Sequence, residues 1–323
     1  MLRLAFFGTP EFAVPTLKRL LAGRHPVVAV VSQPDRPRGR GRHPSPSPVS
    51  AAALAAGVPL FRPERVSDPA TALALRAARP DLGVVVAFGQ FLPKIVRELP
   101  SLGYTINGHA SLLPALRGAA PIARAILAGY RETGISVMRV EREMDAGPVA
   151  RMVATPIGDE EIAGELEGRL AVLAAGALAE AIDDVAAERI RFTPQDDARA
   201  TLAPKLTREE TQLDFREPAR QLVLRIRAFA PRPGATTTLG GEAIRILRAR
   251  ALPGPVDAAP GTAWSRLRAG ESAPLGIATG DGWLAPTLLQ RAGGRALAVD
   301  DFLRGHAVAE GARFGGSTEA AEA

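Results

Sequence analysis

The chain contains no cysteine, and this absence excludes several classes of protein at once. A disulfide-stapled scaffold, a thiol nucleophile and a metal site with cysteine ligands are all ruled out. The absence also fits a reducing cytosol, so we expect a cytoplasmic protein. Histidine is scarce too: the four histidines, at positions 25, 43, 109 and 306, lack the spacing of metal ligands, so we expect no metal.

Long hydrophobic runs are also missing, so we expect no membrane span. The richest run, LAVLAAGALAEAI from Leu170, contains Glu180 and is typical of a packed helix. The N-terminal run is too short for a signal peptide. The turn Gly8-Thr9-Pro10 lacks the three-glycine dinucleotide fingerprint, so neither NAD nor FAD is inferred. The remaining picture is a globular chain of 323 residues, long enough for two domains.

Apolar segments alternate with helical patterns in the N-terminal part. A run at 2–7, a helical pattern around Leu17 and a second run at 26–32 predict a βαβ unit with a parallel sheet. After Pro204 come a helix and short strand-like segments separated by Gly and Pro. We therefore expect an α/β fold with a Rossmann-like, mostly parallel sheet in residues 1–204, and a small β-rich domain in residues 205–323.

One segment, QPDRPRGRGRHPSPSP at 33–48, carries a cluster of basic residues. Its five prolines and two glycines prevent a helix or a central strand, so we expect an exposed loop without regular structure. Four arginines fall within seven residues and are opposed locally by Asp35: Arg36, Arg38, Arg40 and Arg42. A solvated linker and a phosphate-contacting arm are equally good interpretations from the residues alone. The net charge of +6 is compatible with nucleic acid without establishing it.

The candidate site lies in INGHASLLPALRG, from Ile106 to Gly118. Asn107 and His109 point to the same side if the backbone there is extended. Arg117 adds a fixed positive charge, and Leu112 to Pro114 can form an apolar wall. An amide donor beside an imidazole suits acyl transfer, because the amide stabilises charge on a carbonyl oxygen while the imidazole handles a proton. A single loop histidine is more often a structural hydrogen-bonder, so this pattern needs support.

That support comes from EREMDAG at 141–147, which follows the apolar run GISVMRV. It places Asp145 in a loop flanked by Gly147. If the two preceding strands share a sheet edge, Asp145 can meet His109 and orient it.

The stretches INGHASLLPALRGAAPI and TGISVMRVEREMDAGPV resemble the formyltransferases that use 10-formyltetrahydrofolate. Further segments narrow the resemblance to the methionyl-tRNA formyltransferases: FFGTPEFA, QPDRPRGRGR, VVVAFGQFLP, KLTREETQLDF and IRAFAPRPG. The resemblance runs from about Leu2 to about Phe314, in the family's order.

The resemblance implies transfer of a formyl group to the α-amino group of methionine on initiator tRNA, with an OB-like barrel as the second, tRNA-binding domain. It implies three catalytic residues: Asn107, His109 and Asp145. It places the folate donor against two loops, partly through main-chain contacts: Ser111, Leu112, Leu113 and Pro114, and Phe88, Gly89, Gln90 and Leu92. It makes the basic segment the tRNA-contacting arm, with Arg36, Arg38, Arg40 and Arg42. It implies neither a metal nor a stable protein partner.

Two positions depart from the family pattern. Leu116 stands where an aromatic residue is usual, which weakens any stacking role there. Ala230 and Arg232 replace Asn and Trp, which puts the family's packing in the second domain in doubt.

Two alternatives remain open. A related enzyme could formylate or deformylate a sugar-nucleotide amine or glycinamide ribonucleotide, and the residues Asn107, His109 and Asp145 do not distinguish these reactions. The basic segment and the C-terminal domain favour tRNA. A catalytically inactive tRNA-binding protein is the other alternative, and the presence of all three candidate residues argues against it.

Overall fold

The computed structural model describes residues 1–38, 43–269 and 271–315, with the backbone alone at 38, 43, 265–269, 271 and 272. The chain divides into two compact units. The first unit comprises Met1–Pro121, Glu132–Pro156 and Glu167–Ala203. The second comprises Ile122–Arg131, Ile157–Leu166 and Pro204–Ala323. The second unit therefore takes two short segments from the N-terminal part, and the domain boundary at residue 204 stays a prediction.

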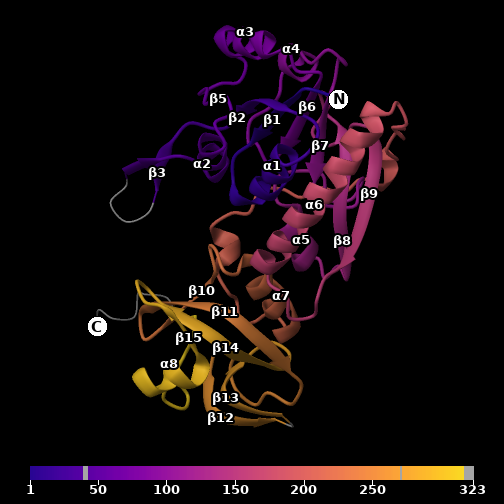
Figure 1. The fold of residues 1–323 in the computed structure, drawn as a ribbon. Helices are drawn as coiled ribbons and strands as arrows, with labels where there is room; N and C mark the ends of the chain where they lie inside the picture. Colours follow the sequence, from indigo (N-terminus) through magenta and orange to yellow (C-terminus); the bar gives the residue numbers. More distant parts are fainter. Residues whose placement is uncertain (39–42, 270, 316–323) are drawn as a thin grey trace. The chain divides into compact units, whose positions relative to one another are not determined.

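The first unit is built on a seven-stranded sheet with the strand order β5-β2-β1-β6-β7-β8-β9 (Figure 1). The five strands from β5 to β7 are parallel, and β8 and β9 are antiparallel to their neighbours. The predicted Rossmann-like, mostly parallel sheet is thus confirmed. Its strands are β1 Leu4–Gly8, β2 Val27–Val31, β5 Leu60–Phe61, β6 Leu82–Val86, β7 Thr105–His109, β8 Glu132–Arg139 and β9 Val149–Pro156.

Helices cover both faces of this sheet, as the fully buried residues of β1 and β6 require. Helix α2 begins where Ser47 Oγ accepts the amide N–H of Ser50 and Pro48 occupies the first turn. Helix α6 runs beside β8 and β9 (Figure 1). Up to residue 203 the helical elements are η1 Glu11–Ala13, α1 Val14–Leu21, α2 Pro48–Ala55, α3 Pro69–Ala78, α4 Lys94–Arg97, α5 Pro121–Leu127, α6 Ala163–Ala186 and η2 Asp197–Arg199. Of these, α5 and the first turn of α6 belong to the second unit.

Strand register decides which face of the sheet each side chain occupies. Phe7 of β1 lies opposite Val85 of β6, and Val85 lies opposite Asn107 of β7. Phe7 and Val85 belong to the core that packs beneath α3 and α4 through Leu75 and Val96. Residues opposite each other on adjacent strands point to the same face. The side chain of Asn107 therefore projects from the α3–α4 face.

The basic segment departs from the prediction. It contains a two-stranded antiparallel ribbon formed by β3 Arg36–Arg38 and β4 His43–Ser45, so the expected absence of regular structure was wrong. Pro37 and Pro44 lie opposite each other. An isolated two-stranded ribbon has non-hydrogen-bonded pairs at alternate positions, where a missing amide donor is tolerated. Arg40 and Arg42 lie outside the described residues.

The second unit contains an antiparallel sheet with the order β10-β11-β14-β13-β12, with β15 paired to β14. Phe314 bridges to Leu239 at the end of β10, and Arg313 bridges to Thr262 just before β12. This segment links the two edge strands, as in an open barrel, and the predicted β-rich fold is confirmed. The elements are η3 Glu209–Thr211, α7 Ala219–Phe229, β10 Ala235–Leu239, β11 Glu242–Leu252, β12 Ala263–Ala269, β13 Glu271–Ala278, β14 Trp283–Arg291, β15 Ala296–Ala298 and α8 Val299–Gly305.

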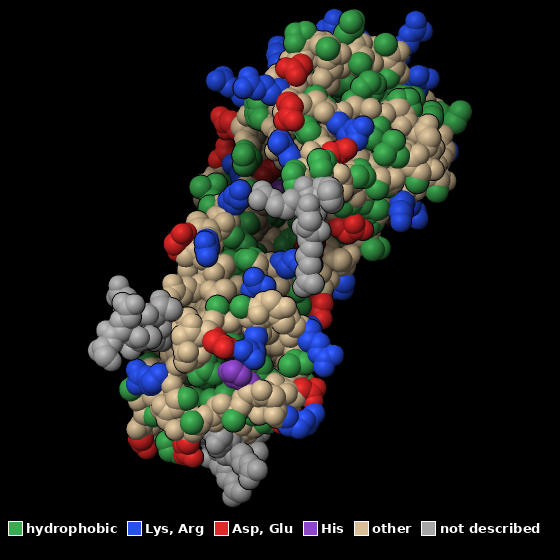
Figure 2. All heavy atoms as spheres, turned by 90° about the vertical axis from the view of Figure 1, so that its left-hand side faces the viewer, with side chains coloured by type: hydrophobic (Ala, Val, Ile, Leu, Met, Phe, Trp, Pro, Cys, Tyr) green, Lys and Arg blue, Asp and Glu red, His purple; other side chains and the backbone are tan. Residues whose placement is uncertain are grey.

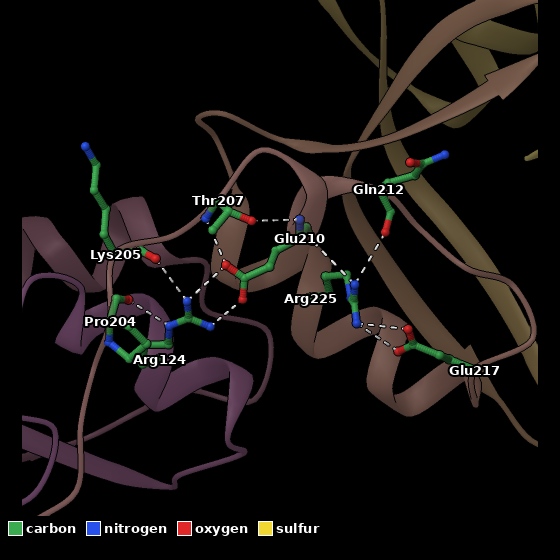
Figure 3. A network of polar contacts seen from close by, with 8 residues as sticks. All are labelled: Arg124, Pro204, Lys205, Thr207, Glu210, Gln212, Glu217 and Arg225. Carbon is green, nitrogen blue, oxygen red and sulfur yellow. Dashed lines mark hydrogen bonds and ion pairs between the residues drawn. The ribbon is translucent and has the colours of Figure 1, made fainter.

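Residues 204–212 enter the second unit through a network of charged contacts (Figure 3). Arg124 on α5 donates to both carboxylate oxygens of Glu210 and, through Nε, to the carbonyl of Pro204 at 3.0 Å. The hydrogen bond from the Arg124 guanidinium is the main reason that the pKa of Glu210 is lowered. Arg225 on α7 donates to the carbonyl oxygens of Glu210 and Gln212, both at 3.4 Å. The entering segment is thereby fastened to two helices of its own unit.

The two departures in IRAFAPRPG are accommodated in the second unit. Ala230 is buried, and its carbonyl accepts the amide N–H of Gly164 at 3.1 Å. A Cβ at position 164 would lie 2.5 Å from Cδ of Pro231, so glycine permits this approach. Arg232 is exposed, which leaves its charge in solvent. The small side chain at 230 therefore fits a closely packed backbone contact.

Candidate active site

Strand β7 presents the first two candidate side chains on one face. Gly108 lies between them and faces α6, where an added Cβ would come 2.9 Å from Cδ1 of Leu178. Asn107 and His109 therefore project from the opposite face, as strand alternation requires. Asn107 is half-buried, whereas His109 is buried. The predicted placement of the amide and the imidazole on one side of the strand matches this arrangement.

The imidazole of His109 has an oxygen acceptor at each ring nitrogen. Nε2 lies 2.9 Å from the carbonyl oxygen of Leu116, and Nδ1 lies 3.5 Å from Oδ2 of Asp145. Each ring nitrogen therefore faces an oxygen atom. The contact with Leu116 has ordinary hydrogen-bond length, and the contact with Asp145 is at its upper limit. The Nδ1 side of the ring is therefore the more loosely held.

Asp145 reaches His109 by a route that differs from the expected one. Strand β8 runs antiparallel to β7, with Ser136 opposite His109 and Arg139 opposite Ile106. The C-terminal ends of β7 and β8 therefore lie at opposite ends of the sheet's strands. The expectation that both strands end on the same side was wrong. The loop after β8 instead folds back over the sheet face. An added Cβ at Gly147 would lie 1.9 Å from the carbonyl oxygen of Arg139, so this reversal requires glycine.

The carboxylate of Asp145 is fixed from a second direction. Its Oδ2 accepts the amide N–H of Gly118 at 2.9 Å. Its backbone has a φ of 53°, in the left-handed region that aspartate tolerates better than most residues. Gly118 has a φ of 123°. The side chain is thus held between an amide donor and the imidazole.

The chain leaving β7 turns across the face of β8. Ser136 Oγ donates to the carbonyl of Ser111 at 2.7 Å and accepts the amide N–H of Leu113 at 3.0 Å. An added Cβ at Gly134 would lie 2.6 Å from Cδ2 of Leu112, so glycine lets the turn approach the strand. Leu113 is buried in a small cluster with Met138 and Val149.

Within the predicted apolar wall, Leu112 and Pro114 stay half-buried and partly accessible to a ligand. Ser111 is buried, and its hydroxyl donates to the carbonyl of Ala115 at 2.6 Å. Leu116, at the position of the first departure, is buried as well. A stacking role for residue 116 would therefore require the loop to open.

Arg117 does not offer its charge to a ligand in this arrangement. It is 9% exposed and donates to Gln195 and to Asp197. Segment 192–203, for which no role was predicted, also bonds the loop directly: Thr201 Oγ1 accepts the amide N–H of Leu116 at 2.9 Å. The segment has no periodicity, so its sequence gave no signal for this role.

The loop after β6 supplies four further predicted residues. Phe88 is buried edge-on against Phe7 with ring centroids 5.7 Å apart, and Leu92 is buried in the same core. The side chain of Gln90 bonds the backbone of Pro63 and Val66. These three side chains are therefore engaged within the protein.

Backbone groups of the same loop remain candidates for ligand contacts. Gly89 is exposed with a φ of 82°, and an added Cβ there would lie 2.4 Å from Nε2 of Gln33. The carbonyl of Phe88 accepts hydrogen bonds from Thr9 Oγ1 and Gln33 Nε2. The amide of Gln33 therefore fills the place that a side chain at position 89 would take.

The predicted arginine cluster is described only in part. Arg36 forms an ion pair with Glu64 at 3.0 Å, and both side chains are exposed. Arg38 has only its backbone described, and Arg40 and Arg42 lie outside the described residues. Figure 2 shows described basic and acidic side chains interspersed over the face in view. On this face the described basic side chains therefore form no uniform basic surface.

Across residues 1–38, 43–269 and 271–315, no group of three or more His, Asp or Glu side chains is placed to hold a metal ion. In that same part of the chain, no helix has the length and apolar character needed to cross a membrane.

Sequence comparison finds matches over nearly the whole chain. The family model described as formyl transferase matches residues 2–182, and formyl transferase, C-terminal domain, matches residues 205–307. A methionyl-tRNA formyltransferase from Pseudomonas entomophila is 45% identical over 300 residues, covering 93% of this chain and 94% of the relative. One from Methylococcus capsulatus is 45% identical over 314 residues, covering 97% and 100%.

Solved structures resemble the chain at lower identity. HypX from Aquifex aeolicus in complex with tetrahydrofolic acid aligns with a TM-score of 0.62 at 18% identity, covering 94% of this chain and 47% of HypX. WlaRD, a sugar 3N-formyl transferase crystallised with dTDP and 5-N-formyl-THF, has a TM-score of 0.62 at 15% identity, covering 93% and 98%. At these identities the likeness concerns the fold alone.

Proposed function

The chain belongs to the methionyl-tRNA formyltransferase family, and from this premise we propose that it transfers the formyl group of 10-formyltetrahydrofolate to the α-amino group of methionine on initiator tRNA. The observation that carries the proposal is 45% identity over 93% of the chain, which includes the C-terminal part as well as the candidate active site. We further propose that it acts in the cytoplasm, in translation initiation.

The reaction joins an amine to a formyl carbon. The nitrogen of methionine attacks that carbon, and the carbonyl oxygen gains negative charge in a tetrahedral intermediate. Asn107 supplies an amide donor and His109 an N–H donor from the same face of β7, an arrangement that supports stabilisation of this oxyanion. Holding amine and donor together removes much of the entropic cost of their encounter.

A proton must move as the intermediate collapses. The attacking nitrogen loses one proton, the bond between the formyl carbon and the folate nitrogen breaks, and the departing nitrogen gains one proton. Asp145 lies 3.5 Å from Nδ1 of His109. We assign Asp145 the roles of orienting His109 and assisting this transfer, because a carboxylate beside an imidazole keeps its donor in place.

We propose that the donor binds between the loop at Ser111, Leu112, Leu113 and Pro114 and the loop at Phe88, Gly89, Gln90 and Leu92. The half-buried side chains of Leu112 and Pro114, with the exposed backbone of Gly89, support this placement. A pteridine ring has flat apolar faces and polar edges, which suit an apolar wall and backbone groups respectively.

The basic segment and the second domain are proposed to hold tRNA. The segment comprises Arg36, Arg38, Arg40 and Arg42, and the domain comprises residues 205–323. Guanidinium groups suit contacts with phosphate oxygens, and the side chain of Arg36 on β3 is exposed. The proposed catalytic domain is residues 1–204.

A second acceptor class is favoured by the structural neighbours alone. WlaRD is described as a sugar 3N-formyl transferase and aligns over 98% of its own length. Its sequence identity is 15%, against 45% for the methionyl-tRNA formyltransferases. The fold therefore permits an amino-sugar acceptor, while the closer sequence relationship favours methionyl-tRNA.

The experiment presents the purified chain with 10-formyltetrahydrofolate and either initiator methionyl-tRNA or a dTDP-linked amino sugar. Mass spectrometry of the amino acid released from tRNA detects N-formylmethionine. We expect rapid formylation of methionyl-tRNA and little or none of the sugar. Preferential formylation of the sugar would overturn the proposed substrate.

A further inference from the structure

The side chain of Gln195 uses its full hydrogen-bonding capacity in one place. Its Oε1 accepts from Nε of Arg117 at 3.0 Å and from Nη2 of the same residue at 2.8 Å. Its Nε2 donates to the carbonyl of Asp145 at 2.8 Å and to that of Gly147 at 2.7 Å. An amide side chain offers two acceptor and two donor positions, and all four are filled.

These partners fix the orientation of the amide. A guanidinium can only donate, and a backbone carbonyl can only accept. Reversing the amide would set its NH₂ group against Arg117 and its oxygen against two carbonyls. A side chain at this position must therefore accept on one side and donate on the other, which a carboxylate cannot do.

The carboxylate of Asp145 is held by the amide N–H of Gly118, and Gln195 bonds the chain on both sides of this hydrogen bond. On one side it bonds Arg117, whose neighbour Gly118 donates its amide N–H to Oδ2 of Asp145. On the other side it bonds the backbone of the Asp145 loop itself. Asp145 has a left-handed backbone, with φ of 53°, that other contacts must stabilise.

We propose that Gln195 is a positioning residue that holds Asp145 against His109 during formyl transfer. It acts through the backbone of residues 145–147 and not on the reacting atoms. The inference rests on the proposed function. The 3.5 Å separation between Asp145 Oδ2 and His109 Nδ1 is at the limit of a hydrogen bond, so a small shift of the loop removes the contact.

Two variants of Gln195 separate the accepting side of the amide from its donating side, and a third variant elsewhere is the control. Gln195→Glu keeps an acceptor for Arg117 and removes both donors to the Asp145 loop. Gln195→Met has similar length and removes both functions. In either variant Asp197 still accepts from Arg117, so the guanidinium keeps a partner. Gln290→Met is the matched control, because Nε2 of Gln290 also donates to a backbone carbonyl, that of Gly294 in the second unit.

The measurement is kcat and KM for formylation of methionyl-tRNA, with thermal unfolding of each variant as a check on folding. A displacement of about 1 Å in a catalytic group costs about a hundredfold in rate. We expect Gln195→Glu and Gln195→Met to lower kcat by about ten- to a hundredfold, with KM for both substrates within about twofold of the wild type. Gln290→Met should match the wild type.

A double-variant comparison tests whether the effect passes through Asp145. In the Asp145→Ala background, adding Gln195→Met should lower kcat by less than about twofold, because the group being positioned is already absent. An undiminished loss in that background would overturn the inference, as would wild-type kcat in Gln195→Glu. Failure of the proposed function is distinguishable, because the wild-type protein itself would then leave methionyl-tRNA unformylated.

Discussion

At the scale of single residues, the contacts of His109 set its chemistry. One ring nitrogen is bonded to a carbonyl at 2.9 Å, and the other faces Asp145 at 3.5 Å. The shorter contact fixes the plane of the ring, while the longer one holds Nδ1 more loosely. The role proposed for Asp145 therefore depends on its charge more than on a short hydrogen bond.

Asp145→Asn tests that dependence on charge. An asparagine can still accept the amide N–H of Gly118, so we expect the loop to keep its fold. The negative charge beside His109 is lost, and kcat should fall by about a hundredfold or more, as for other acid–base groups. Asp183→Asn is a matched control, since Asp183 lies 3.1 Å from Nε2 of His25 in another histidine–carboxylate pair. Comparable losses in both variants would count against a specific role for Asp145.

Asn107→Ala tests the oxyanion assignment. If Asn107 bonds the oxygen only as charge develops, its loss should lower kcat by about a hundredfold while leaving the affinity for the folate donor nearly unchanged. Steady-state kinetics combined with direct binding of the donor separates the two effects. A weakened affinity with unchanged kcat would instead make Asn107 a binding residue.

The residue scale also shows where sequence reasoning ends. The common orientation of Asn107 and His109 followed from strand alternation, a local rule. The contact between Asp145 and His109 was expected because the strands that precede them were thought to end on the same side of the sheet. Strand β8 runs the other way, and its direction depends on pairing between distant segments, which local patterns do not reveal. The side chains of Phe88 and Leu92 are buried in the core, and burial depends on the tertiary packing of helices that periodicity alone does not place.

At the scale of elements, the arginine segment and segment 192–203 depart most from expectation. Proline and glycine content predicted a loop at 33–48, yet β3 and β4 pair there. In 192–203 the important contacts are single hydrogen bonds to residues about 50 to 85 positions away in sequence. Such contacts leave no periodic pattern, which is why the holding of the active-site loop by this segment was not predicted.

The basic segment at 33–48 leads to a prediction about the salt dependence of tRNA binding. Alanine at Arg36, Arg38, Arg40 or Arg42 should change the free energy of unfolding by no more than about half a kcal/mol, as is usual for exposed substitutions. Each lost phosphate contact should weaken tRNA binding and reduce the salt-dependence slope by about one unit. Arg42 is the expected exception, with a loss of preference for initiator over elongator methionyl-tRNA of about 1–3 kcal/mol.

The measurement is formylation of both tRNAs by the four single variants over a salt series. Arg189→Ala supplies a control, since Arg189 is exposed and pairs with Asp184 in the first unit. If all four variants behave like this control, the segment is a solvated linker. The basic segment would then have no role in binding tRNA.

The contact between Arg124 and Glu210 predicts a pH dependence of stability. The guanidinium lowers the pKa of Glu210 from its ordinary value of 4.5. A carboxylate with a lowered folded-state pKa stabilises the fold above its ordinary pKa, and this contribution is lost as the pH falls through the lowered value. Glu210→Gln should therefore lower the free energy of unfolding by about 1 kcal/mol at pH 7, and the difference should shrink below pH 4.5.

Asp214 is the comparison for this prediction. Its pKa is lowered further, to about 2, by hydrogen bonds from Arg216. However, the side chain of Arg216 is 83% exposed, and pairs in water contribute little. Denaturant unfolding at pH 7 should therefore show a smaller effect of Asp214→Asn than of Glu210→Gln. The reverse order would show that these pKa shifts, rather than burial, determine the contribution to stability.

At the scale of the whole molecule, the fold does not identify the acceptor of the formyl group, whereas sequence identity does indicate it. The alternation of strands and helices predicted a Rossmann-like sheet followed by a β-rich domain, because both follow from local patterns of apolar residues. The same fold occurs in a sugar 3N-formyl transferase with a TM-score of 0.62. The acceptor is therefore inferred from sequence identity over both parts of the chain and not from the fold.

We propose that formyl transfer to methionyl-tRNA takes place at His109. The most direct test is a single-turnover measurement with the wild type and His109→Ala, both saturated with 10-formyltetrahydrofolate and initiator methionyl-tRNA. We predict that the wild type forms N-formylmethionyl-tRNA in a rapid first turnover. The variant, folded and binding both substrates, should do so about a hundredfold or more slowly. Equal rates in the two proteins would contradict the account.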